Sequence, residues 1–224
     1  MKNNFHKVSS KIKNFKSQRC AFIICLTLFI LMFPKYNNYP SFFGIEIFTL
    51  FLQIILPFLV IMIIFREKLT DYGLSLGNKR EGITLSLIFL LAYIPFFLIL
   101  LNSGNFFNYY IPTLIQISSL KSLVILEAKN FIEVLKCEFI FRGFLLFGLK
   151  KEFGDNNSIL VQTIPYSLVH IGNPELECYG SILVGLSLGY LALRTRSIWY
   201  GFMLHWLISG VFSLVFLYKI NKIF

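Results

Sequence analysis

Four ionisable side chains lie in stretches of the sequence that are otherwise almost entirely apolar. Glu138 and Arg142 fall within Cys-Glu-Phe-Ile-Phe-Arg-Gly, and His170 and His205 fall within two later apolar segments. An ionisable side chain in a transmembrane segment costs at least a few kcal/mol unless it has a partner, so each one is a functional candidate. A glutamate and two imidazoles together can activate water and stabilise an oxyanion, which are the needs of peptide-bond hydrolysis.

Each of these residues belongs to a pair that is spaced to share one helical face. Glu138 precedes Arg142 by four residues, with the acid on the N-terminal side, which is the favourable order for an ion pair. At the helical rise, Glu138 lies about 18 Å from Lys150 and Lys151, which places it near the middle of a membrane. The same spacing links Tyr166 with His170, and His205 with Ser209. We therefore expect one buried polar site, although a purely structural Glu138–Arg142 ion pair is an alternative.

The same glutamate and two histidines could also ligate zinc. However, Arg142 lies one turn from Glu138 and would already satisfy its carboxylate, and the sequence has no His-Glu-x-x-His motif. The four cysteines show no Cys-x-x-Cys pair and no metal-ligand spacing. We therefore expect no metal ion, no other cofactor and no disulfide framework.

Transmembrane helices must position these residues, because the composition excludes an ordinary soluble domain. Of the 224 residues, 56% are hydrophobic and 14% are charged, whereas a soluble domain has about 25% charged residues. Several uncharged runs approach the roughly 20 residues that a helix needs to cross a bilayer. The sequence predicts an all-α, polytopic transmembrane bundle of about seven helices (six to eight). They are expected at residues 20–34, 43–65, 83–101, 117–149, 157–171, 179–193 and 198–218, the fourth being long enough to divide.

The distribution of charge predicts the orientation. The net charge is +10, but the basic residues form short clusters between apolar runs, where they set topology and touch anionic headgroups instead of binding nucleic acid. With the N-terminus inside, the cytoplasmic side carries 14 Lys and Arg residues and the opposite side three. We expect an integral, multi-pass protein of the bacterial cytoplasmic membrane with its N-terminus inside. Residues 1–19 would be a basic cytoplasmic segment and 20–224 a single membrane domain.

The ordered motifs resemble the CPBP family of intramembrane proteases, which includes CAAX prenyl proteases and bacteriocin-processing enzymes. The family has two adjacent glutamates followed after three residues by arginine, then an aromatic residue four before a histidine, then a histidine four before an asparagine. This sequence has Cys137-Glu138-x-x-x-Arg142, Tyr166-x-x-x-His170 and His205-x-x-x-Ser209, all within residues 130–210. The resemblance implies that Glu138 or a nearby acid activates water. His170 and His205 would bind the oxyanion, and Arg142 would orient the carboxylate.

Two positions depart from the family pattern. Cys137 stands where the family has the first glutamate, its proposed water-activating base, and Ser209 stands where it has asparagine. Neighbouring helical residues point about 100° apart, so Glu138 could replace the missing acid only in a turned helix or a rearranged site. Glu177, seven residues after His170, is either a compensating acid or a solvated loop charge. For Cys137 we expect packing, since a catalytic thiolate needs an electropositive, accessible setting.

The sequence thus predicts an intramembrane endopeptidase that cleaves membrane-anchored peptides or protein tails. Its partners would be that substrate and the lipid bilayer, with no nucleic acid. The alternative is a non-catalytic relative that acts as an immunity or scaffold membrane protein, which Cys137 and Ser209 favour. A proton-coupled transporter would also place glutamate and histidine in the membrane, but the two halves of the sequence show no repeated helix pattern.

Overall fold

The computed structural model describes residues 18–34 and 42–220, and the side chains of 18–34 and 45–220. Within these residues the chain is helical apart from turns and one isolated bridge between Ile171 and Asn173. The apolar helices suited to a membrane are the shorter Gln18–Pro34 and the four longer spans Ile45–Phe65, Lys79–Asn102, Glu175–Thr195 and Trp199–Lys219. The predicted all-α membrane bundle is confirmed. The basic segment predicted over 1–19 lies outside the described residues except for its last two.

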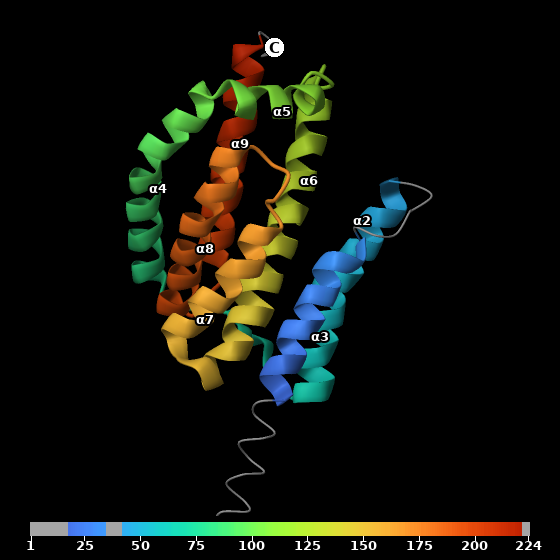
Figure 1. Ribbon diagram of the computed structural model, residues 1–224, viewed down its shortest axis with the longest axis vertical. Coiled ribbons are helices and arrows are strands. Elements are labelled where there is room, and N and C mark those ends of the chain that lie inside the picture. The colour runs from blue at the N-terminus through green and yellow to red at the C-terminus, as the bar shows by residue number, and fades with distance from the viewer. Residues whose placement is uncertain (1–17, 35–41, 221–224) are drawn as a thin grey trace, which may run out of the picture.

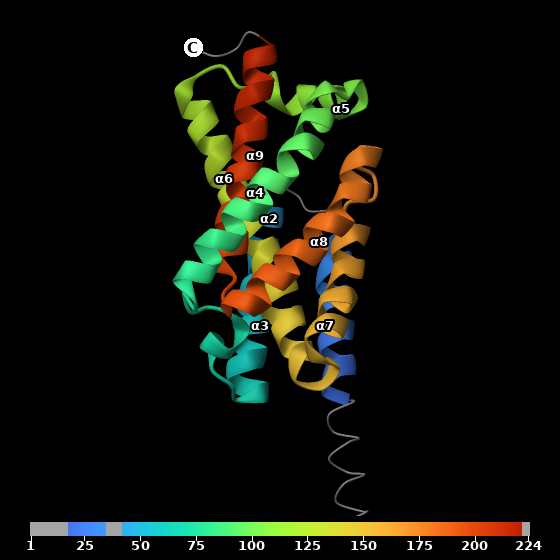
Figure 2. The same ribbon diagram turned by 90° about the vertical axis from the view of Figure 1, so that its left-hand side faces the viewer.

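A pair of helices leans against the side of a larger bundle (Figure 1). The pair consists of Gln18–Pro34 and a long helix made of α2 (Phe42–Leu50), η1 (Phe51–Ile55), α3 (Leu56–Leu59) and η2 (Val60–Phe65). The short helix η3 (Leu69–Tyr72) follows, and the larger bundle contains α4 (Lys79–Asn102), α5 (Gly104–Leu114), α6 (Leu120–Glu138), η4 (Phe139–Phe147), α7 (Gly148–Leu168), α8 (Glu175–Thr195) and α9 (Trp199–Lys219). In Figure 2, α8 runs obliquely beside α7, against which it packs.

The centre of the molecule is a helix formed by α6, the π-helical segment η4 and the first turns of α7. Every residue of η4 is buried, as expected for a helix that is apolar on nearly all sides. Gly154 then interrupts α7 with a φ of 73° and a ψ of 172°. This break separates the helices predicted over 117–149 and 157–171. The helical pitch changes directly after Glu138, and π-helical segments often occur at functional sites.

The helix α5 was not among the predicted elements. Glycine, asparagine and Pro112 interrupt its apolar pattern, and its start is capped by Ser103, whose hydroxyl accepts a hydrogen bond from the Phe106 amide. The Phe106 ring is buried against Phe212 and Phe216 of α9, at centroid distances of 5.1 and 5.5 Å. Packing on α9 therefore stabilises an 11-residue helix that would be marginal in isolation.

A buried lysine joins α2 to α6. Lys136 is 1% exposed, and its Nζ forms an ion pair with Glu133, donates to the Thr49 hydroxyl at 3.0 Å, and lies 3.5 Å from the Glu46 carboxylate. A buried lysine is costly unless it is paired. These contacts therefore fix α2 against the helix that carries the central motif.

At the opposite end of the same helix pair, Glu67 collects three donors. It accepts hydrogen bonds from Arg19 at 2.7 Å, from the Tyr72 hydroxyl at 2.6 Å and from Lys151 at 2.5 Å. These residues come from the first described helix, from the connector after η2 and from α7. The network therefore ties three segments together at the lower end of the molecule in Figure 1.

The connector before α4 fixes the start of α9. The Asn78 amide donates to the Thr195 carbonyl at 2.9 Å, and the Ile198 amide donates to the Gly73 carbonyl at 2.9 Å. Gly77 has a φ of +51°, and a Cβ there would lie 1.8 Å from the Thr195 oxygen. Only glycine fits this close approach, which holds the beginning of the last helix in place.

Candidate active site

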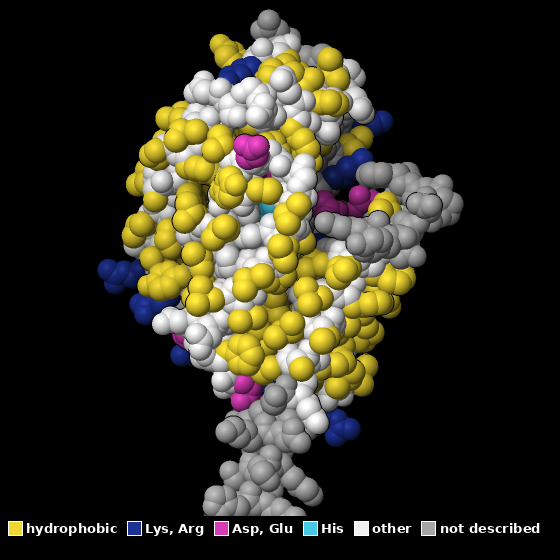
Figure 3. All heavy atoms as spheres, viewed as in Figure 1, with side chains coloured by type: hydrophobic (Ala, Val, Ile, Leu, Met, Phe, Trp, Pro, Cys, Tyr) yellow, Lys and Arg dark blue, Asp and Glu magenta, His cyan; other side chains and the backbone are white. Residues whose placement is uncertain are grey.

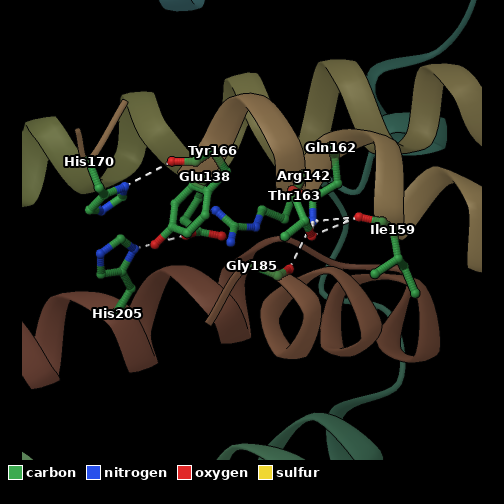
Figure 4. A network of polar contacts seen from close by, with 9 residues as sticks. All are labelled: Glu138, Arg142, Ile159, Gln162, Thr163, Tyr166, His170, Gly185 and His205. Carbon is green, nitrogen blue, oxygen red and sulfur yellow. Dashed lines mark hydrogen bonds and ion pairs between the residues drawn. The ribbon is translucent and has the colours of Figure 1, made fainter. Parts of the chain in front are cut away.

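Glu138 lies at the centre of the buried polar cluster and points toward α9. Its side chain is fully buried, and its Oε1 accepts hydrogen bonds from Arg142 Nη1 at 3.1 Å and from His205 Nδ1 at 2.9 Å (Figure 4). Its Oε2 has no hydrogen-bond partner and packs against Gly201, where an added Cβ would approach to 3.2 Å. The ion pair expected between Glu138 and Arg142 is therefore present. The contact with His205 extends this ion pair to a second helix, α9.

The hydrogen bond from His205 determines which ring nitrogen is free. An ionised carboxylate only accepts, so Nδ1 of His205 carries the proton, and Nε2 of the neutral ring can accept one. The same reasoning applies to His170, whose Nδ1 donates to the Tyr166 carbonyl at 2.8 Å. The two rings point toward one another in Figure 4. The site therefore presents two imidazoles, each oriented by its own acceptor.

Arg142 lies beneath Glu138 in the buried polar cluster, against the ring of Tyr166. It is fully buried, and its guanidinium lies 4.2 Å from the centroid of the Tyr166 ring, a cation–π contact. Its Nε and Nη2 have no hydrogen-bond partner. Arg142 therefore neutralises the charge of Glu138 while keeping donors that the fold leaves unused.

Behind Arg142, a glutamine fixes the spacing of α7 and α8. The Gln162 amide donates to the Gly185 carbonyl at 2.8 Å and to the Thr163 hydroxyl at 2.8 Å, and it is fully buried (Figure 4). The sequence interpretation missed this residue. The sequence could have indicated it, because Gln162 precedes Tyr166 by four positions and therefore lies on the same helical face as Tyr166 in a mostly apolar stretch.

A cavity of about 470 Å³ adjoins the two histidines. Its wall is mostly aromatic and aliphatic, with contributions from α4, α5 and α9 that include Phe96, Phe97, Phe106, Phe212 and Phe216. Tyr166, His170, His205, Ser209 and Glu177 also line it. On the molecular surface, histidine atoms are visible at a hollow surrounded by apolar side chains (Figure 3). This combination of an apolar wall and a few converging polar groups is typical of a ligand site.

Cys137 lies beside the same cluster. Its Sγ, a carboxylate oxygen of Glu138 and a ring nitrogen of His205 all lie within 4.8 Å of one another. Two neighbouring residues on α6 therefore both lie near one imidazole. Sulfur, nitrogen and oxygen atoms in such a group could hold zinc, but Arg142 already pairs with the carboxylate and would repel a cation.

Glu177 lies on the cavity wall but does not contact Glu138. Its carboxylate accepts from the Tyr110 hydroxyl at 2.8 Å and from the Asn173 amide at 2.7 Å. These bonds connect α5 to the start of α8 and to the turn before it. Tyr110 was missed by the sequence interpretation, because α5 itself was not predicted. Ser209 lines the cavity one turn after His205.

A family model for "Type II CAAX prenyl endopeptidase Rce1-like" matches residues 119–211. This range begins at the cap of α6, ends within α9, and contains all eight candidate site residues. No curated protein and no solved structure matches the chain. The family match confirms the resemblance expected from the three motifs: residues 119–211 are similar to type II CAAX prenyl endopeptidases, which are intramembrane proteases of the CPBP family.

Proposed function

We propose that the protein is an active intramembrane endopeptidase that cleaves membrane-anchored peptides or protein tails at the cavity beside His170 and His205. The observation that carries this proposal is the hydrogen bond from His205 Nδ1 to the buried Glu138 carboxylate. A carboxylate that holds an imidazole in one tautomer is the arrangement of a general base. No cofactor is needed for this chemistry.

In this proposal Glu138 is a positioning residue for His205 instead of the base that touches water. Its carboxylate is fully buried and already accepts two hydrogen bonds, whereas His205 is part-exposed and lines the cavity. His205 accepts a proton from the nucleophile through Nε2, and Glu138 stabilises the resulting imidazolium. His170, on the facing side, passes a proton to the leaving amine and donates to the oxyanion when it is protonated.

The cavity wall supports a substrate with an apolar anchor. Phe96 and Phe97 of α4 and Phe212 and Phe216 of α9 line the space next to the imidazoles. An apolar segment can pack there while the peptide bond beyond it meets the polar groups. We further propose that the N-terminus is cytoplasmic. The basic residues Arg19 and Lys151 bind Glu67 at the end of the bundle where the first described helix begins, and basic residues are enriched on the cytoplasmic side of membrane proteins.

The proposal is tested by reconstituting the purified protein in vesicles with short membrane-anchored peptides and detecting new termini by mass spectrometry. Glu138→Gln, His170→Ala and His205→Ala should each lower cleavage by about 100-fold or more, the range expected for lost acid–base catalysis. Ser187→Ala is the matched control, because Ser187 is a part-exposed polar residue on a membrane helix and its hydroxyl donates to the Leu183 carbonyl. Undiminished cleavage in all three site variants would exclude this function.

A non-catalytic immunity or scaffold role is the second candidate. Two observations favour this role. Position 137 carries a cysteine instead of an acid, and the neighbouring carboxylate of Glu138 is fully buried and so is not accessible to water. If the wild-type protein cleaves nothing and Cys137→Glu cleaves, the chain is a degraded relative. Cleavage by the wild-type protein would exclude this second candidate.

A further inference from the structure

We propose that Cys137 is the nucleophile of this site and that cleavage proceeds through a thioester on its sulfur. His205 would be the base and Glu138 the residue that positions it. This inference rests on the proposed peptidase function for its substrate, but its first test needs no substrate. It departs from the packing role that the sequence suggested for Cys137.

The geometry combines the three groups of a thiol-dependent catalytic site. A thiol, an imidazole and a carboxylate lie within 4.8 Å of one another, and the imidazole donates to the carboxylate at 2.9 Å. Nucleophile, base and orienting acid in this order are the recurring signature of covalent peptide cleavage. Contacts between nucleophile and base are often longer without substrate than during reaction.

Arg142 offsets part of the unfavourable effect that burial and Glu138 have on a thiolate at Cys137. Glu138 would oppose a thiolate, but its charge is shared with the fully buried Arg142 at 3.1 Å. The Arg142 guanidinium is also close enough to interact with the thiol itself. The thiol is therefore activated by the neighbouring imidazole, which takes its proton during the attack, and not by the surrounding charges.

The other cysteines lack this setting. Among the described residues, the group of at least three sulfur, nitrogen and carboxylate donors contains Cys137 and no other cysteine. Cys20 is buried and Cys25 is exposed on the first described helix, while the Cys178 thiol donates to the His170 carbonyl. Cys137 is part-exposed. Cys25 and Cys178 can therefore act as internal references for thiol reactivity.

The reaction balances with water as its only co-reactant. The Cys137 sulfur attacks the peptide carbonyl carbon, and the thiol proton passes to the His205 nitrogen that Glu138 does not bind. The tetrahedral intermediate collapses, the C–N bond breaks, and the amine leaves with a proton. Water then adds to the thioester carbon, the C–S bond breaks, the acid product is released and the thiol recovers its proton. No oxidation or reduction occurs.

The first test measures the alkylation rate of each cysteine by iodoacetamide in the full-length protein, with site-resolved mass spectrometry. His205→Ala should slow alkylation of Cys137 by at least about tenfold, because the base is lost. The rates at Cys25 and Cys178 should stay unchanged. Truncating His205 enlarges the space near the thiol, so a cysteine with only a packing role would react at the same rate or faster. That result would overturn the assignment.

His170→Ala is the matched variant, since it also removes an imidazole from the cavity wall. It should leave the alkylation rate of Cys137 within about threefold of the wild-type rate, because no constellation with Cys137 includes His170. If His170 and not His205 controls the rate, the assigned base is wrong. If Cys137 does not react at all while Cys178 does, the thiol is not available and the proposal fails.

The second test uses cleavage and separates this inference from the proposed function. Cys137→Ala should lose cleavage as fully as His205→Ala, and a thioester-linked peptide should be trapped on Cys137 and released by hydroxylamine. Cleavage by Cys137→Ala at the wild-type rate would overturn the nucleophile while leaving the peptidase function intact. A wild-type protein that cleaves no peptide, yet shows alkylation that depends on His205, would remove the peptidase function and leave the activated thiol.

Discussion

The buried pair of Glu138 and Arg142 allows a double-mutant cycle that separates folding from catalysis. Both side chains are fully buried, and removing one partner of a buried ion pair costs about 3–5 kcal/mol because the other charge is left unpaired. Glu138→Gln and Arg142→Met should each lower the free energy of unfolding by that amount. Independent effects would give a loss of about 6–10 kcal/mol in the double variant. Because the double variant has no unpaired charge, we expect its loss to stay near that of one single variant.

The assay is equilibrium unfolding in mixed micelles, followed by the fluorescence of Trp199 and Trp206, both on α9. Ser187→Ala serves as the control for a neutral change on a membrane helix. The double variant should be about as stable as either single variant and should still fail to cleave, since His205 still lacks the carboxylate that stabilises its protonated ring. Additive losses of stability, or cleavage by the double variant, would contradict the roles given to this pair.

Three further predictions concern the surroundings of the site. Burial raises the pKa of the Glu67 carboxyl, but hydrogen bonds from Lys151 and Tyr72 outweigh burial and leave this pKa below its ordinary value. The carboxylate therefore stabilises the fold above its ordinary pKa, and this contribution is lost as the pH falls through the lowered pKa. Glu67→Gln should accordingly make the free energy of unfolding less dependent on pH in the acid range. Tyr110→Phe removes the hydroxyl bound to Glu177 and should increase amide hydrogen exchange in α5, with Tyr110→Trp as a bulkier comparison; unchanged exchange would show that this bond does not hold α5. Incubation with chelators should leave cleavage unchanged, and a loss that added zinc restores would establish a metal site instead.

The pattern of apolar runs was sufficient to predict the membrane bundle and its main helices. The i, i+4 spacing of Glu138 and Arg142 also predicted their ion pair, because both residues belong to one helix. Such spacing shows which residues share one face of a helix, but it does not show which residue of another helix packs against that face. The contact between Glu138 and His205, 67 positions apart, therefore required the packing of α6 on α9.

The sequence interpretation was weakest where tertiary packing overrides local signals. The helix α5 has Gly104 at its start and Pro112 inside it, and it forms because Phe106 packs on α9. The π-helical pitch after Glu138 has no comparable signature in the residue pattern. The sequence interpretation placed Cys137 and Glu138 about 100° apart on an ideal helix, and in the folded protein both side chains lie near the ring of His205.

The lysine bridge between α2 and α6 has a consequence for biogenesis. Glu46 precedes Lys136 by 90 positions, so its carboxylate is synthesised before the cation emerges from the ribosome. Glu133 leaves the ribosome just before Lys136 and accompanies it as an ion-pair partner. When α6 joins the bundle, an acid is thus present both on the incoming helix and on a helix already made. Assembly of the first helix pair with the larger bundle can then follow the order of translation, and a chain without Glu46 should dock α6 on that pair less efficiently than the wild-type chain.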